Sequence, residues 1–270
     1  MGKKRSGFRI SALLRVVPTI WERWSERISM ITWLYPERCP VCLRIVMPKG
    51  AELHPKCKYK LDTITEPICF KCGVPLSSEE EEYCSVCIQE PDRGWDIGRS
   101  VFPYHGIMGN ALHLVKKEGT KEFIRFFAKH IKESQQYFIQ QTAPECIVPV
   151  PLHKMKLRSR GFNQAELLAE ALGEEIGLPV RKLLIKEKKT KDQKSLSRNE
   201  RKKNVNDVFC VNEEEMGTEI PLSVLLLDDV STTGSTLTAC AHTLKAYGVK
   251  RVSYISICAA EQIKETVSKS

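Results

Sequence analysis

The sequence predicts an α/β protein with a mainly parallel sheet flanked by helices, preceded by a small cysteine-rich module. Three observations predict this class. Apolar, strand-like runs alternate with helical periodicity from residue 99 to 258, which is the order of parallel-sheet proteins. A fully apolar run at 224–227 passes directly into a hydroxyl-rich turn and then into a helix. Between residues 39 and 87, cysteine pairs recur at a fixed spacing that is typical of metal-stabilised modules.

The N-terminal segment, residues 1–36, is predicted to carry an amphipathic helix. Residues 10–34 place apolar side chains, among them Leu14, Trp21 and Trp24, at helical spacing with charged side chains between them. This helix is expected to pack on the rest of the protein or on a partner. Its tryptophans leave a place on a membrane surface open as an alternative.

Composition indicates a globular chain with one main domain and one small one. The 270 residues are 42% hydrophobic and 28% charged, with a net charge of +9. No apolar run is long enough to span a bilayer, and no secretory cleavage pattern is present, so we expect no integral membrane segment. Eleven cysteines without an export signal favour a reducing compartment and metal-bound thiolates. We therefore expect a cytoplasmic protein, with the inner face of the membrane open as a location.

A repeated metal-ligand pattern defines the module predicted over residues 37–90. Each copy has a C-x2-C pair, an eleven-residue gap and a second pair with the same internal spacing. The two copies are Cys39, Cys42, His54 and Cys57, then Cys69, Cys72, Cys84 and Cys87. Two such pairs close a tetrahedron, and four protein ligands leave no open position, so structural Zn²⁺ is the expected occupant. Disulfides and an iron–sulfur cluster are the alternatives, disfavoured by compartment and by ligand spacing respectively.

The elements of the main domain, residues 98–262, follow a linker predicted at 91–98. Strands are expected at 99–104, 146–150, 181–185, 207–211, 224–227 and 251–258, and helices at 107–117, 121–138, 162–175 and from Leu237 onward. Ligands of such sheets bind beyond the carboxyl ends of the strands. Two of these ends carry the residue types that recognise phosphate and sugar.

The first of them follows the strand at 224–227, where Asp228 and Asp229 precede a turn of small hydroxyl residues. The turn consists of Thr232, Thr233, Gly234, Ser235 and Thr236. Free N–H groups at a helix start bind anions, and carboxylates accept strong hydrogen bonds from ribose hydroxyls. The pattern therefore predicts a phosphoribose site, in which Mg²⁺ could bridge acids and phosphate oxygens. The alternative is a strand–turn–helix without a ligand.

The second follows the strand at 146–150, where Lys154, Lys156, Arg158 and Arg160 occur without an intervening acid. Arginine matches phosphate oxygens well, so Arg158 and Arg160 are predicted to bind a diphosphate if this loop lies beside the turn. A basic surface loop without a ligand is the alternative.

A basic segment at 181–203 holds eleven Lys and Arg against three acids, a local charge of +8. Such a segment favours phosphate-rich partners, a lid over the site, or a solvated loop with no partner. The candidate nucleic-acid contacts are Lys154, Lys156, Lys188, Lys189, Lys191, Lys194, Arg198, Arg201, Lys202 and Lys203. Such contacts would hold a nucleic acid through its phosphates.

Several motifs, taken in order, resemble known families. Residues 224–236 resemble the phosphoribosyl pyrophosphate (PRPP) motif of type I phosphoribosyltransferases, with Ser231 where that family has an aliphatic residue. The run Arg160-Gly161-Phe162-Asn163-Gln164 is similar to the signature of the ComF family of bacterial competence proteins. So are the spaced residues from Gln193 to Phe209, the stretch from Tyr104 to Lys117, and the cysteine module.

The resemblance implies a double zinc-ribbon module, a phosphoribosyltransferase-type domain and a role in natural transformation. Its implied partners are incoming single-stranded DNA, PRPP and other DNA-uptake proteins. Two functions stay open. The first is a transferase that uses Asp228 and Asp229 as catalytic acids toward an unknown acceptor, and the second is a DNA-binding module that keeps the fold without turnover.

Overall fold

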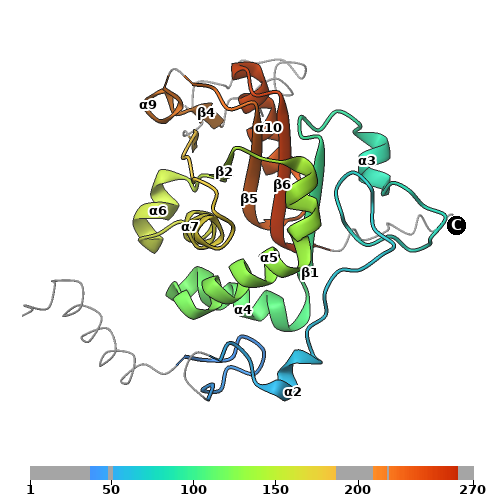
Figure 1. Ribbon diagram of the computed structural model, residues 1–270, viewed down its shortest axis with the longest axis vertical. Helices are drawn as coiled ribbons and strands as arrows, with labels where there is room; N and C mark the ends of the chain where they lie inside the picture. Colours follow the sequence, from blue (N-terminus) through green and yellow to red (C-terminus); the bar gives the residue numbers. More distant parts are fainter. Residues whose placement is uncertain (1–36, 48–50, 187–208, 218, 261–270) are drawn as a thin grey trace, which may run out of the picture. The chain divides into compact units, whose positions relative to one another are not determined.

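Four parallel strands form the central sheet of the computed structural model, in the spatial order β1-β6-β5-β2 (Figure 1). The strands are β1 (Ile97–Pro103), β2 (Cys146–Pro149), β5 (Ser223–Ser231) and β6 (Arg251–Ala259). In the middle of the sheet, Leu227 of β5 pairs with Pro149 on one side and with Ile255 on the other. The predicted parallel α/β architecture is confirmed.

The structure describes residues 37–47, 51–186, 209–217 and 219–260. The helix predicted at 10–34 and the larger part of the basic segment therefore lie outside the described residues. None of the described helices combines the length and apolar character needed to cross a lipid bilayer.

Helices cover both faces of the sheet because the apolar side chains of β5 alternate between them. Val224 and Leu226 pack with α10 (Ser235–Tyr247), whereas Leu225 and Leu227 pack on the opposite face. The helices of that face are α4 (Gly106–Glu118), α5 (Lys121–Thr142) and α7 (Gln164–Ile176). Every inward position of β5 is thus buried between two helical layers, as the uninterrupted apolar run predicted.

The cysteine-rich module covers β1, an edge strand of the sheet. Edge strands expose unpaired backbone groups unless something covers them. Here the N–H of Ile64 donates to the Val101 carbonyl of β1 at 2.8 Å, and the N–H of Gly98 donates to the Lys71 carbonyl at 2.7 Å. The module also contains two short helices, α2 (Pro55–Lys58) and α3 (Ser85–Gln89).

The two halves of this module pack on different faces of the sheet. Leu53 of the first half packs against the α4 and α5 side, whereas Cys72 and Cys87 of the second are buried on the α10 side. The segment predicted as a linker is itself packed, because Trp95 is 2% exposed and stacks edge-on against Tyr254 of β6 at 4.9 Å between ring centroids. From Arg38 onward the chain is one compact unit.

At the carboxyl end of the sheet the structure differs from the predicted elements in three places. Strand β5 continues through both acids to Ser231, because Asp228 and Ser231 still pair with Ser256 and Ala259 of β6. The basic stretch predicted as a turn is a short helix, α6 (Lys154–Arg160), which ends at Gly161 with φ 83°. The helix predicted from residue 162 starts at Gln164, since the Asn163 side chain accepts the N–H of Ala165 at 3.1 Å and caps it.

The strands predicted beside the basic segment form a separate antiparallel pair. They are β3 (Leu184–Lys186) and β4 (Phe209–Val211), followed by the short helix α9 (Glu213–Met216), which was not predicted.

Candidate functional site

The predicted turn lies at the carboxyl end of the sheet, beside the loop that follows β2. The N–H of Val150 donates to the carbonyl of Leu227 at 2.9 Å, which joins the ends of β2 and β5. Between β5 and α10 the side chains of Thr232, Thr233 and Ser235 are exposed. Gly234 is the N-cap of α10 and adopts φ 73°, a conformation that favours glycine. The turn is therefore open to an anion at the start of a long helix.

Asp229 is held by two side chains from distant elements. Its Oδ2 lies 2.9 Å from Lys116 Nζ of α4 and accepts a hydrogen bond of 2.7 Å from Gln164 Nε2 of α7. Arg160 donates to the Oε1 of that same Gln164. The residue is 7% exposed, so its charge is stabilised by these partners rather than by bulk water. The network fixes the Oδ2 oxygen of this carboxylate in one position.

Asp228 has a raised pKa. Its Oδ1 accepts the backbone N–H of Asp229 at 2.8 Å. Burial, reinforced by the negative charge of Asp229, raises the pKa of Asp228 to about 8. The paired acids therefore carry less than two negative charges at neutral pH. A cation that binds them would displace a proton from Asp228.

Of the predicted diphosphate and DNA contacts, one is linked to the acids and the others on α6 are exposed. Arg160 reaches the acid site through Gln164, whereas Arg158, Lys154 and Lys156 are exposed on α6, a helix with no buried residue. The candidates from Lys188 to Lys203 lie outside the described residues.

Lys116 and Gln164 are site residues that sequence reasoning missed. Gln164 lies within the Arg160–Gln164 motif, and Lys116 within the Tyr104–Lys117 stretch, but neither pattern assigns a role to the single residue. Only the packing of α4 and α7 on the same sheet face brings both to Asp229.

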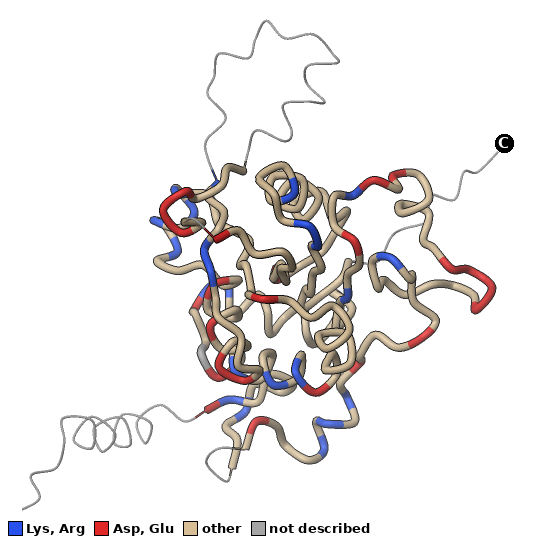
Figure 2. The backbone as a smooth tube through the Cα atoms, turned by 45° about the horizontal axis from the view of Figure 1, so that its top comes forward, with Lys and Arg blue, Asp and Glu red and all other residues tan. Residues whose placement is uncertain are grey.

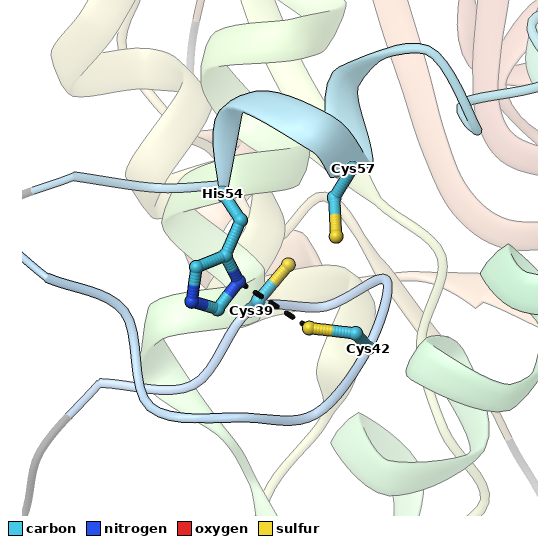
Figure 3. A group of neighbouring side chains, drawn as sticks. All are labelled: Cys39, Cys42, His54 and Cys57. Carbon is cyan, nitrogen blue, oxygen red and sulfur yellow. Dashed lines mark hydrogen bonds between the residues drawn. The ribbon is translucent and has the colours of Figure 1, made fainter.

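The first predicted metal-ligand set converges in the structure. Figure 3 shows the sulfurs of Cys39, Cys42 and Cys57 gathered around the imidazole of His54, and the four ligand atoms lie within 4.8 Å of one another. His54 Nε2 lies 2.9 Å from the carbonyl of Ile45 and so carries the proton, while Nδ1 faces Cys42 Sγ at 3.3 Å. This orientation leaves Nδ1 free to ligate, with the carbonyl fixing the tautomer.

The second set is more deeply buried, and all four of its cysteines belong to the core. Cys72 Sγ and Cys84 Sγ are 3.6 Å apart. The pKa of Cys69 falls well below its usual value, because its sulfur takes hydrogen bonds first from Cys72 and then from Cys84 and Cys87. Four buried sulfurs within 4.8 Å of one another fit a tetrahedral thiolate site, and both clusters are consistent with structural zinc.

Comparisons with known proteins agree with this organisation. Residues 30–88 match the model of a double zinc ribbon domain. The chain is 30% identical over 193 residues to competence protein F of Haemophilus influenzae, covering 69% of this chain and 82% of that protein. It is 31% identical over 202 residues to competence protein ComFC of Bacillus subtilis, covering 71% of this chain and 77% of the relative. The DNA utilization protein YhgH of Escherichia coli is 26% identical over 195 residues, covering 71% and 83%.

The chain belongs to the ComF/ComFC family of competence and DNA utilization proteins, and it carries that family's double zinc ribbon.

Proposed function

We propose that this protein handles DNA in natural transformation, together with other DNA-uptake proteins, and binds a phosphorylated ribose at the turn between β5 and α10. One observation carries the ligand proposal: an open hydroxyl-rich turn directly follows two acids, one of which is buried and held by cationic and amide groups. A phosphate requires N–H and hydroxyl donors, and a sugar diol requires fixed carboxylate acceptors.

In this proposal the residues divide the ligand among themselves. The turn from Thr232 to Thr236 binds the 5-phosphate, and Asp228 and Asp229 accept the ribose hydroxyls. Arg160, with Arg158 from the exposed side of α6, faces the diphosphate of PRPP. Mg²⁺ would be held mainly by diphosphate oxygens, with carboxylate oxygens of the acids, since it prefers few protein ligands.

We expect PRPP with Mg²⁺ to bind, and to bind more tightly as the pH rises from 6.5 to 9. Below a pKa of about 8 Asp228 holds a proton, which must leave before the carboxylate meets a cation or a hydroxyl donor. Calorimetry in buffers of different ionisation enthalpy measures both affinity and proton release. Absence of binding heat across this range at millimolar PRPP would contradict the proposal, and ribose 5-phosphate serves as the comparison ligand without the diphosphate.

For DNA we propose that α6, together with the basic segment that follows β3, tracks the phosphate backbone of a single strand. The charge distribution of the described residues favours this face. The acidic runs at 79–82 and 213–215 form continuous red stretches in Figure 2 and would repel DNA, whereas α6 carries four cations and no acid. Met155 and Leu157, 62% and 39% exposed on the same helix, offer apolar surface to unstacked bases.

Replacing Lys154 and Lys156 with alanine should weaken single-stranded DNA binding and flatten its salt dependence. Each phosphate contact contributes a slope of about −0.7 in log K against log salt, so the double variant should lose roughly 1.4 of slope. Fluorescence anisotropy with an oligothymidine from 50 to 300 mM salt measures this. Lys56→Ala with Lys58→Ala, on α2 at the same spacing, is the matched control. An unchanged slope for the α6 variant would remove α6 from the interface.

A second candidate function is transfer of ribose 5-phosphate from PRPP to an acceptor. The buried carboxylate of Asp229 favours it, because departure of pyrophosphate leaves positive charge on the ribose that such a group stabilises. Release of pyrophosphate from PRPP, followed by phosphorus NMR with and without single-stranded DNA, separates turnover from binding alone.

A further inference from the structure

Beneath the phosphate turn lies a buried arginine that does not belong to the sheet. Arg93 is 4% exposed and precedes β1, in the segment that leaves the second ribbon. Its Nη2 donates to the carbonyl of Thr233, the residue before Gly234 in the turn. The proposed ligand contacts do not include this side chain, although it is bonded to the backbone of the turn.

The other contacts of Arg93 tie it to the second ribbon. Nη1 donates to the Glu90 carboxylate at 2.6 Å, and Glu90 is the C-cap of α3, the helix that carries Cys87. The guanidinium also lies over the ring of Trp95, 5.5 Å from its centroid, and Lys71 of the same ribbon lies over that ring at 5.6 Å. One side chain therefore spans from the end of a metal-bearing helix to the backbone of the turn.

The hydrogen bond to Thr233 has a geometric consequence. In a trans peptide the C=O and the following N–H point in opposite directions. When Arg93 holds the Thr233 carbonyl toward the interior, the N–H of Gly234 is directed to the opposite side of the peptide plane. A cation on the carbonyl also polarises the peptide and strengthens that N–H as a donor.

Gly234 is required for the same arrangement. A Cβ at this position would lie 2.5 Å from Arg93 Nη2, in addition to the strain of φ 73°. Any larger residue would displace the arginine from the carbonyl. The turn and Arg93 thus fit each other only when residue 234 has no side chain.

We propose that Arg93 is a positioning residue for the phosphate turn, and that through it the second ribbon sets the orientation of the turn's amide groups. The role of Arg93 in ligand binding rests on the proposed phosphoribosyl site, whereas its role in orienting the turn does not. Arg93 fixes the N–H of Gly234 before a ligand arrives, so phosphate binding does not have to order this donor.

Hydrogen exchange of the ligand-free, zinc-loaded full chain tests the structural part. Arg93→Lys keeps the charge but replaces the two guanidinium nitrogens that bond Glu90 and Thr233 with a single ammonium on a shorter reach, so peptides spanning 230–238 should exchange roughly tenfold faster. Glu90→Ala should give a smaller increase in the same peptides. Arg99→Lys is the matched control. Arg99 follows Gly98, which bonds to the second ribbon, and its side chain donates to the Gly98 carbonyl at 2.8 Å. Zinc content and exchange in β6 should not change.

Unchanged exchange at the turn in Arg93→Lys would overturn the proposal, and so would faster exchange spread over the whole sheet, which indicates a merely structural role. Titration of PRPP and Mg²⁺ then tests the functional part, with an expected affinity loss of about tenfold for Arg93→Lys and none for Arg99→Lys. If the unaltered protein binds no PRPP, the proposed function fails, while the exchange result still decides the role of Arg93.

Discussion

Replacing Cys84 with serine should cost most of the stability of the protein, whereas Cys42→Ser in the first cluster should cost markedly less. Apparent zinc-binding free energies of about 10–16 kcal/mol in small zinc domains act as folding energy, and loss of one ligand forfeits a large part of it. The total stability of a typical domain is only about 5–15 kcal/mol. We therefore expect Cys84→Ser to be unfolded or destabilised by roughly 4 kcal/mol or more.

The difference between the clusters follows from where they are buried. Cys84 and its three partners are packed in one core with Tyr254 of β6 and Leu237 of α10, and the Tyr254 hydroxyl donates to the Cys72 carbonyl at 2.9 Å. Losing the second cluster therefore disturbs the sheet itself. The first cluster has its own small core with Val46, and Cys42 is partly exposed.

Urea unfolding followed by circular dichroism, with zinc content measured on the same samples, checks this order. Cys210→Ser is the control, a partly exposed cysteine outside both clusters. Equal midpoints for Cys42→Ser and Cys84→Ser would show that burial of the second cluster does not connect it to the sheet.

Replacing Asp229 with asparagine should lower the affinity for PRPP with Mg²⁺ by at least about 100-fold, because hydrogen bonds to a charged group contribute roughly 1.5–3 kcal/mol each. The change removes the acceptor for the sugar and the partner of Lys116 together. It also leaves Lys116 and Gln164 facing an amide, which reorients the link to Arg160.

The same variant should bind single-stranded DNA as the unaltered protein does, because Lys154 and Lys156, the proposed DNA contacts of α6, have no part in this network. Calorimetry with PRPP and anisotropy with an oligonucleotide, run on one preparation, measure both. Asp62→Asn, an exposed acid of the ribbon module, is the control. Normal PRPP affinity in Asp229→Asn would place the ligand elsewhere, and parallel loss of both affinities would indicate one shared site.

The sheet and both ligand clusters were predictable because their signals are local. An apolar run such as Val224 to Leu227 indicates that the strand is buried on both faces. The spacing from Cys69 to Cys87 predicts that these cysteines converge as ligands of one ion. Zinc occupancy and PRPP binding themselves stay predictions.

What the sequence did not predict depends on packing between distant segments. Lys116 becomes a partner of Asp229 only when α4 and α7 share a face of the sheet, and Arg93 reaches the turn only because the second ribbon packs on the other. The helix α6 was missed because four cations in seven residues suggest solvated turn rather than helix, although Gly161 ends it in the left-handed conformation.

The backbone bonds from Ile64 and Lys71 to β1 bear on how the protein can be dissected. A fragment that begins at β1 would lose the cover over its first strand and expose apolar side chains on both sides of the sheet. Such a fragment is a template for intermolecular strand addition. Experiments on such a fragment would accordingly measure aggregation, and the shortest fragment with a protected first strand has to begin ahead of Ile64.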